Sequence, residues 1–258
     1  MVQGERMKVL EPTVTILLMS HMKPTIEDAI QSINSQTRLN DVQVVIIDSG
    51  AWVNELKDTQ NETVLILRFV YEQVVQKNGF EWYFTGEKLN ARSKYCPVSH
   101  WTNYAIKNGL VRGKYLATFY DDDVYHSDFI EKMAGYLDEH SECEMVRCSQ
   151  SRTVIKSDGS HFSTSPLLSE APILPGENMD CRVDGGQVMM RMSLFEKIPY
   201  PYFPEDPDVS SCSHSDGIFF NKVTNVITSP VGCIPETLYD HRNTIYSTFT
   251  PSEPKETV

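Results

Sequence analysis

Long apolar runs are missing from the sequence, and the run near its start extends only from Val14 to Met19. A signal peptide needs a longer apolar core beside a basic start, and a membrane span needs about 20 apolar residues. Neither pattern occurs, so we expect a cytoplasmic protein without a transmembrane segment.

Basic residues are scarce relative to acidic ones. The chain has 23 Lys and Arg against 35 Asp and Glu, which gives a formal net charge of −12. This balance argues against a nucleic-acid surface and against general attraction to anionic lipid.

The cysteines form no recognisable framework. There are six, they are scattered, and none belongs to a C-x-x-C pair or a Cys/His cluster. We expect reduced structural thiols, because an even number of cysteines is weak evidence for disulfides in a chain this long.

Internal repeats, low-complexity tracts and an obvious interdomain linker are also absent. A chain of 258 residues with a 40% hydrophobic share can bury one sizeable core. We therefore expect a single domain over residues 1–250, followed by a disordered tail at 251–258.

The first half alternates β-rich runs with amphipathic, helix-like segments. The expected strands are 13–19, 42–48, 63–71 and 114–120, and the expected helices are 23–37, 52–59, 99–111 and 127–140. Nearly continuous apolar strands separated by helices indicate an α/β fold with a parallel sheet covered on both faces.

Acidic residues follow two of these strands directly. Asp48 closes 42–48, and Asp121 to Asp123 follow 114–120. Ligands bind at the carboxyl ends of strands in open sheets of this kind, so we expect both acidic positions on the same rim.

The acidic triplet has two possible explanations. Adjacent carboxylates about 5 Å apart repel by roughly 3 kcal/mol at an effective dielectric near 20. If the strand continues through them, Asp121 and Asp123 point the same way and offer two hard oxygen ligands to Mg²⁺ or Mn²⁺ holding a diphosphate. The alternative is a solvated acidic turn that caps the next helix.

Two blocks resemble the family 2 glycosyltransferases of the GT-A fold. The stretch "TVTILLMSHMKPTIEDAIQSINSQTRLNDVQVVIIDSG" (13–50) has a strand, a Pro-containing helix ending in Ser-x-x-x-Gln and a strand ending in Asp. The stretch "SHWTNYAIKNGLVRGKYLATFYDDDV" (99–124) is similar to the block that leads into the family's D-x-D motif. The match covers about 13–135 well and 180–225 more loosely.

The resemblance implies a mostly parallel, Rossmann-like sheet flanked by helices, with a nucleotide-sugar-binding half at 13–135 and a loop-rich acceptor-binding half at 136–250. It implies inverting transfer from a nucleotide-sugar, for which we expect UDP, to a glycan or other hydroxyl-bearing acceptor. It also implies an Mn²⁺ or Mg²⁺ ion.

In this resemblance, Asp48, Asp121 and Asp122 bind the nucleotide, Asp121 lies near the metal as well, and Asp123 is a metal ligand. The chain departs from the family at His100-Trp101-Thr102-Asn103, where an Arg-Asn pair is common, and at Ser49-Gly50 after Asp48. These departures leave the base and the sugar open.

For the catalytic base we select Asp216 in "SCSHSDGIFFNKV". It precedes a helix-like segment and so resembles the family's acidic residue at the start of a helix. Asp216 could instead only cap that helix, and Asp206 in "PEDPD" is the rival base. Upstream, Gly185 and Gly186 would let the backbone approach the sugar, or form an ordinary turn.

The late segment "LYDHRNTIYS" resembles a mobile His/Arg segment that closes over the donor in related enzymes. His241 would complete the metal shell or contact phosphate, and Arg242 would pair with the diphosphate. Arg92 is a further phosphate candidate. Each could also be an ordinary surface residue.

Two other functions remain open at this level. A nucleotidyltransferase also uses strand-end aspartates and a metal, although "LLMSHMKP" lacks the glycine-rich loop such enzymes carry after the first strand. A catalytically silent nucleotide- or carbohydrate-binding module could keep the same fold. The oligomeric state is not indicated by the sequence.

Overall fold

The computed structural model describes residues 11–20, 25–48, 77–84, 97–156, 160–180, 182–205 and 215–243. Several predictions fall outside these described residues: the helix 52–59, the strand 63–71, Arg92, Asp206 and the tail 251–258.

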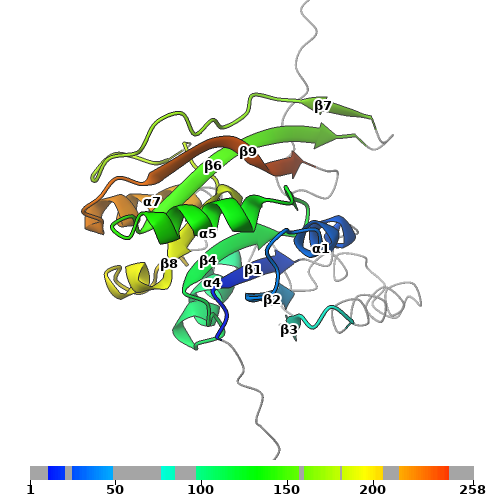
Figure 1. Ribbon diagram of the computed structural model, residues 1–258, viewed down its shortest axis with the longest axis horizontal. Helices are drawn as coiled ribbons and strands as arrows, with labels where there is room; N and C mark the ends of the chain where they lie inside the picture. Colours follow the sequence, from blue (N-terminus) through cyan, green and yellow to red (C-terminus); the bar gives the residue numbers. More distant parts are fainter. Residues whose placement is uncertain are drawn as a thin grey trace, which may run out of the picture.

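One half of the sheet is parallel, as expected. Its strands are β1 (Val14–Ser20), β2 (Val42–Asp48), β3 (Glu81–Phe84) and β4 (Tyr115–Tyr120), in the order β3-β2-β1-β4 (Figure 1). All seven residues of β1 are buried, which explains why its sequence is apolar without alternation.

The other half of the sheet is mixed. β4 pairs antiparallel with β8 (Val188–Arg191), which pairs antiparallel with β6 (Met145–Ile155). β9 (Gly232–Asn243) runs parallel to β6 and pairs antiparallel with β5 (Val124–Tyr125), while β7 (His161–Ser163) pairs antiparallel with the end of β6. The described strands thus form one nine-stranded sheet.

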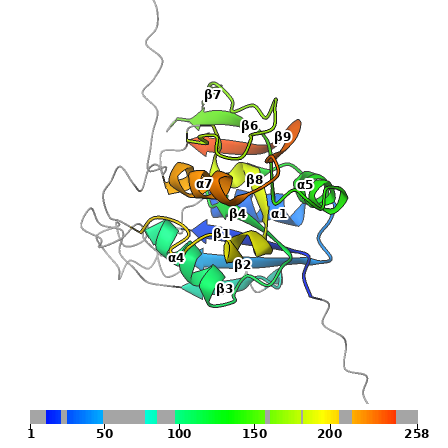
Figure 2. The same ribbon diagram turned by 90° about the vertical axis from the view of Figure 1, so that its left-hand side faces the viewer.

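Helices cover both faces of this sheet. α1 (Ile26–Asn34) and α5 (Phe129–Glu139) pack on one face, and α4 (Pro97–Lys107) and α7 (Ser215–Val226) pack on the other (Figure 2). The α/β expectation is confirmed. Within the described ranges, none of the helices is both long enough and apolar enough to cross a membrane.

The Ser-x-x-x-Gln phrase has a structural role at the end of α1. The Gln36 amide donates from Nε2 to the carbonyl of His126 (2.7 Å) and accepts at Oε1 from the N–H of Ile130 (3.0 Å). Ser32 accepts at Oγ from the N–H of Tyr125 (3.2 Å). These bonds hold the segment that follows Asp123 and supply an acceptor to an orphan N–H in the first turn of α5.

Candidate functional site

The two acidic positions lie on the same rim of the sheet. Ser20 pairs with Asp48 across β1 and β2, and Met19 pairs with Tyr120 across β1 and β4. Asp48, the last residue of β2, and Asp121, the first residue after β4, therefore lie on either side of β1. The Ser20 hydroxyl also donates to Oδ2 of Asp121 (3.2 Å). The acids are buried: Asp48 is 2% exposed, Asp121 1%, Asp122 7% and Asp123 0%.

The triplet is a turn and not a strand end, so our argument from strand alternation was wrong. β4 stops at Tyr120, and the N–H of Asp123 donates to the Tyr120 carbonyl at 3.3 Å. As a result, Asp121 contacts β1, whereas Asp123 contacts β9. The burial of all three side chains also excludes a solvated acidic turn.

Asp123 is held by contacts from three residues of β9. Its Oδ2 accepts a hydrogen bond from the Tyr239 hydroxyl, and its Oδ1 accepts from the N–H of Arg242 at 2.8 Å. Nδ1 of His241 lies 3.3 Å from the same Oδ1. Burial raises the pKa of Asp123, and the charge of His241 opposes that rise.

His241 lies between two carboxylates. Its Nδ1 is 3.9 Å from Oδ2 of Asp184 as well as 3.3 Å from Asp123. Burial by itself would lower the pKa of His241, but Asp123 and Asp184 together raise it to about 9. Within the described part of the chain, this Nδ1 is buried without a well-directed hydrogen bond, so the ring faces the carboxylates only as an ion pair.

Arg242 fastens the triplet to α1. Its Nε donates to the main-chain carbonyl of Asp122 (2.9 Å), and its Nη2 donates to Oδ2 of Asp28 (3.0 Å). The family resemblance predicts that the segment containing His241 and Arg242 is mobile. In the structure both residues belong to β9, which is paired with β6.

Asp216 lies in the first turn of α7, and its carboxylate contacts η1 and the end of β4. Its Oδ2 accepts from the N–H of Gly185 (3.0 Å) and lies 3.5 Å from the Tyr120 hydroxyl. Burial, followed by the negative charge of Asp184, raises the pKa of Asp216 to about 6. A carboxylate with this pKa is ionised at neutral pH and can accept a proton.

The glycines beside it form η1 (Gly185–Gln187), a single 3-10 turn capped by Asp184. A Cβ on Gly185 would lie 2.6 Å from the Tyr120 hydroxyl and 2.8 Å from Oδ2 of Asp216. A Cβ on Gly186 would overlap the ring of Tyr239. A Cβ at either position would therefore displace a group of the site: the Asp216 carboxylate and the Tyr120 hydroxyl at Gly185, or the Tyr239 ring at Gly186.

The sequence analysis missed three residues of the site: Tyr120, Asp184 and Tyr239. Asp184 could have been noticed, because it directly precedes the glycine pair that drew our interest. Tyr120 and Tyr239 carry no local signal, since aromatic residues are common in strands and usually belong to the core.

The residues that depart from the family pattern on α4 hold the segment before Asp206. Asn103 accepts at Oδ1 from the N–H of Phe203 and donates from Nδ2 to its carbonyl, both at 2.9 Å. Nδ1 of His100 lies 3.5 Å from Oε2 of Glu205. Asn103 and His100 thus hold the residues that directly precede the rival base, Asp206.

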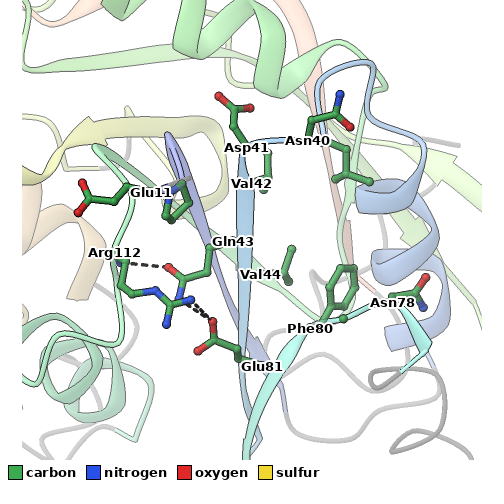
Figure 3. A pocket seen from close by; sticks show the side chains of 13 residues that line it. Glu11, Asn40, Asp41, Val42, Gln43, Val44, Asn78, Phe80, Glu81 and Arg112 are labelled. Carbon is green, nitrogen blue, oxygen red and sulfur yellow. Dashed lines mark hydrogen bonds and ion pairs between the residues drawn. The ribbon is translucent and has the colours of Figure 1, made fainter. Parts of the chain in front are cut away.

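A cavity of about 860 Å³ lies at the opposite end of the strands (Figure 3). Gln43 and Arg112 line it, and both donate to Oε1 of Glu81. The cavity extends along β2 as far as Val44, and the four steps from there to Asp48 span about 13 Å. It is therefore separate from the acidic rim.

Across the described ranges, no three His, Cys, Asp or Glu side chains are arranged to hold an ion. Mg²⁺, however, is commonly bound by one or two carboxylates with water and substrate phosphates. The buried Asp123 fits the protein's share of such a site, and His241 beside it would join as a ligand by releasing the Nδ1 proton that pairs with Asp123.

The mixed sheet and the helices on both of its faces give the chain a Rossmann-like α/β fold. S. aureus TarS has this architecture, with a TM-score of 0.58 at 14% identity over 89% of this chain and 36% of TarS. TarS 1–349 in complex with UDP-GlcNAc gives a TM-score of 0.57 at 15% identity, over 90% and 58% of the two chains.

The sequence comparisons are more distant. No protein-family model matches the chain. The protein CgeD of Bacillus subtilis (strain 168) is 24% identical over 235 residues, which are 88% of this chain and 50% of CgeD. The chain thus spans about half the length of this relative.

Proposed function

We propose that the protein is an inverting glycosyltransferase that moves a sugar from a UDP-sugar to an acceptor hydroxyl. One observation carries the proposal: Asp123 and Asp216 come from distant parts of the chain and meet at η1. The N–H of Gly185 donates to Asp216, and the ring of Tyr239, whose hydroxyl holds Asp123, lies against Gly186. A donor-binding group and a proton acceptor are the two functions that such a transfer requires. The likeness to TarS, whose structures contain UDP and UDP-GlcNAc, supports the choice of donor.

The donor would bind along the rim formed by β2, β1 and β4. Asp48 would contact the base or ribose, and Asp121, held by Ser20, would lie near the ribose. Asp122 would remain a nucleotide contact and Arg92 a phosphate contact. Mn²⁺ or Mg²⁺, held by Asp123 and His241 with Asp121 nearby, would stabilise the charge on the departing diphosphate.

The acceptor hydroxyl would lose its proton to Asp216. Its oxygen attacks the anomeric carbon opposite the leaving group, the bond to the diphosphate breaks, and the proton passes to Oδ1 or Oδ2 of Asp216. The N–H of Gly185 orients this carboxylate at 3.0 Å, and Tyr120 lies beside it. Asp206 remains the rival base.

The test is UDP release from a panel of UDP-sugars, with and without Mn²⁺, using alcohols and glycans as acceptors. We expect release that depends on both the metal and one of the sugars. Binding of UDP without release from any donor would instead indicate a silent nucleotide-binding module. Release of pyrophosphate from a nucleoside triphosphate would indicate a nucleotidyltransferase.

A further inference from the structure

Tyr239 occupies an unusual position between the two halves of the site. It is 0% exposed on β9, and its hydroxyl donates to Oδ2 of Asp123. On its other side its ring lies against the turn η1, where even a methyl group on Gly186 would overlap it. The ring therefore fills the space between η1 and the acidic triplet.

The orientation of Asp123 depends on β9 within the described part of the chain. Tyr239 supplies the hydrogen bond to Oδ2, and the N–H of Arg242 supplies the one to Oδ1 at 2.8 Å. With both oxygens held, the carboxylate cannot rotate, and Oδ1 stays directed toward Nδ1 of His241, 3.3 Å away. Of these two donors, only the Tyr239 hydroxyl belongs to a side chain and can be removed by substitution.

The same turn also holds the second acidic group. Gly185 donates from its N–H to Asp216 at 3.0 Å, and Gly186, the next residue, leaves room for the ring that reaches Asp123. The two carboxylates are therefore tied to consecutive residues of η1, one directly and one through Tyr239.

We propose that Tyr239 is a positioning residue for Asp123, and that Gly186 is glycine so that the Tyr239 hydroxyl can reach that carboxylate. The inference rests on the proposed function, because it gives Asp123 the role of holding a divalent cation. Partners that orient a metal-binding carboxylate contribute about 10- to 100-fold to metal affinity.

The test is calorimetric titration of the whole chain with Mn²⁺ in the presence of UDP. In Tyr239→Phe only the hydroxyl is lost, and we expect Mn²⁺ to bind about 10- to 100-fold more weakly. At saturating Mn²⁺ the turnover number should return to within a few-fold of the wild type. Gly186→Ala, which displaces the ring, should weaken Mn²⁺ binding in the same way.

Two matched controls separate positioning from a general loss of packing. Tyr125→Phe removes another fully buried hydroxyl, which donates to the carbonyl of Thr118 at 2.9 Å. Gly135→Ala adds a methyl group where no neighbouring atom lies within 4 Å. Both should bind Mn²⁺ as the wild type does, whatever their melting temperatures.

If Tyr239→Phe and Gly186→Ala bind Mn²⁺ as tightly as the wild type and only melt earlier, the positioning role is wrong and the proposed function stands. If the wild type binds neither Mn²⁺ nor Mg²⁺ with UDP present, the metal role in the proposed function is wrong, and this inference is overturned with it.

Discussion

The Asp216 carboxylate accepts a hydrogen bond from the backbone N–H of Gly185, with 3.0 Å between Gly185 N and Asp216 Oδ2. This bond joins the first turn of α7 to η1 and directs the carboxylate with a donor that cannot rotate away. The Tyr120 hydroxyl lies 3.5 Å from the same oxygen, so the last residue of β4 also contacts the Asp216 carboxylate.

Replacing Asp216 by Asn should remove sugar transfer while sparing the donor. Asparagine can still accept the bond from Gly185 but cannot take a proton, and a general base contributes about 10²- to 10⁴-fold to the rate. UDP release with acceptor measures the loss, and titration with UDP checks binding. The control is Glu139→Gln, which removes an exposed carboxylate on α5. Unchanged transfer by Asp216→Asn would move the base to Asp206.

The rate should depend on the ionisation of Asp216. Because burial and Asp184 raise its pKa to about 6, the base is protonated and inactive below that value. We expect kcat/KM to fall about tenfold per pH unit on the acid side and to be level from pH 7 to 8. A profile that stays level down to pH 4.5 would contradict the assignment.

The raised pKa of Asp216 also makes the stability of the fold depend on pH, and stability falls over the pH range in which activity rises. The folded-state pKa of Asp216 lies above its ordinary value of 3.8, so the folded protein binds the proton more tightly than the unfolded chain. Its favourable contribution is complete below about pH 4 and is lost as the pH rises to about 6. Asp216→Asn should therefore gain stability relative to the wild type between pH 4 and pH 6, as measured by urea denaturation at each pH.

Replacing Asp123 by Ala should affect both activity and stability. It leaves the buried Tyr239 hydroxyl without its acceptor and leaves His241 with only the more distant Asp184, and breaking a buried pair costs about 3–5 kcal/mol. We expect no metal-dependent turnover and weaker UDP binding.

Asp128→Ala is the control for that change, since it breaks only a surface pair with Lys132 worth about 0–1 kcal/mol. Intact metal-dependent turnover in Asp123→Ala would contradict the site.

Replacing Gln36 by Ala should loosen the segment that follows the acidic triplet. It leaves the carbonyl of His126 and the N–H of Ile130 without their side-chain partner, at a cost of about 1–3 kcal/mol. Urea denaturation measures the change, with Gln31→Ala, an exposed position on α1, as the control. Equal stabilities of the two variants would show that the Ser-x-x-x-Gln phrase has no such role.

The sequence was sufficient for three strands of the parallel half, whereas β3 was not predicted. β1, β2 and β4 lie within one residue of their expected bounds, because a strand buried on both faces must be apolar along its length. Parallel strands then bring their carboxyl ends to one edge, so the placement of Asp48 and Asp121 on a common rim could also be predicted.

The mixed half depended on contacts between distant residues. β9 contains Asp240, His241 and Arg242, and its polar sequence gave no sign of a strand; it forms because β6 supplies a long partner. Tyr239 and Asp123 are 116 residues apart, and no local pattern relates them. The periodicity of the sequence shows which face of a helix or strand is buried. Only the packed chain determines which side chains from separate elements meet. The contacts around Asp123 and Asp216 join separate elements, so the tertiary structure alone determined them.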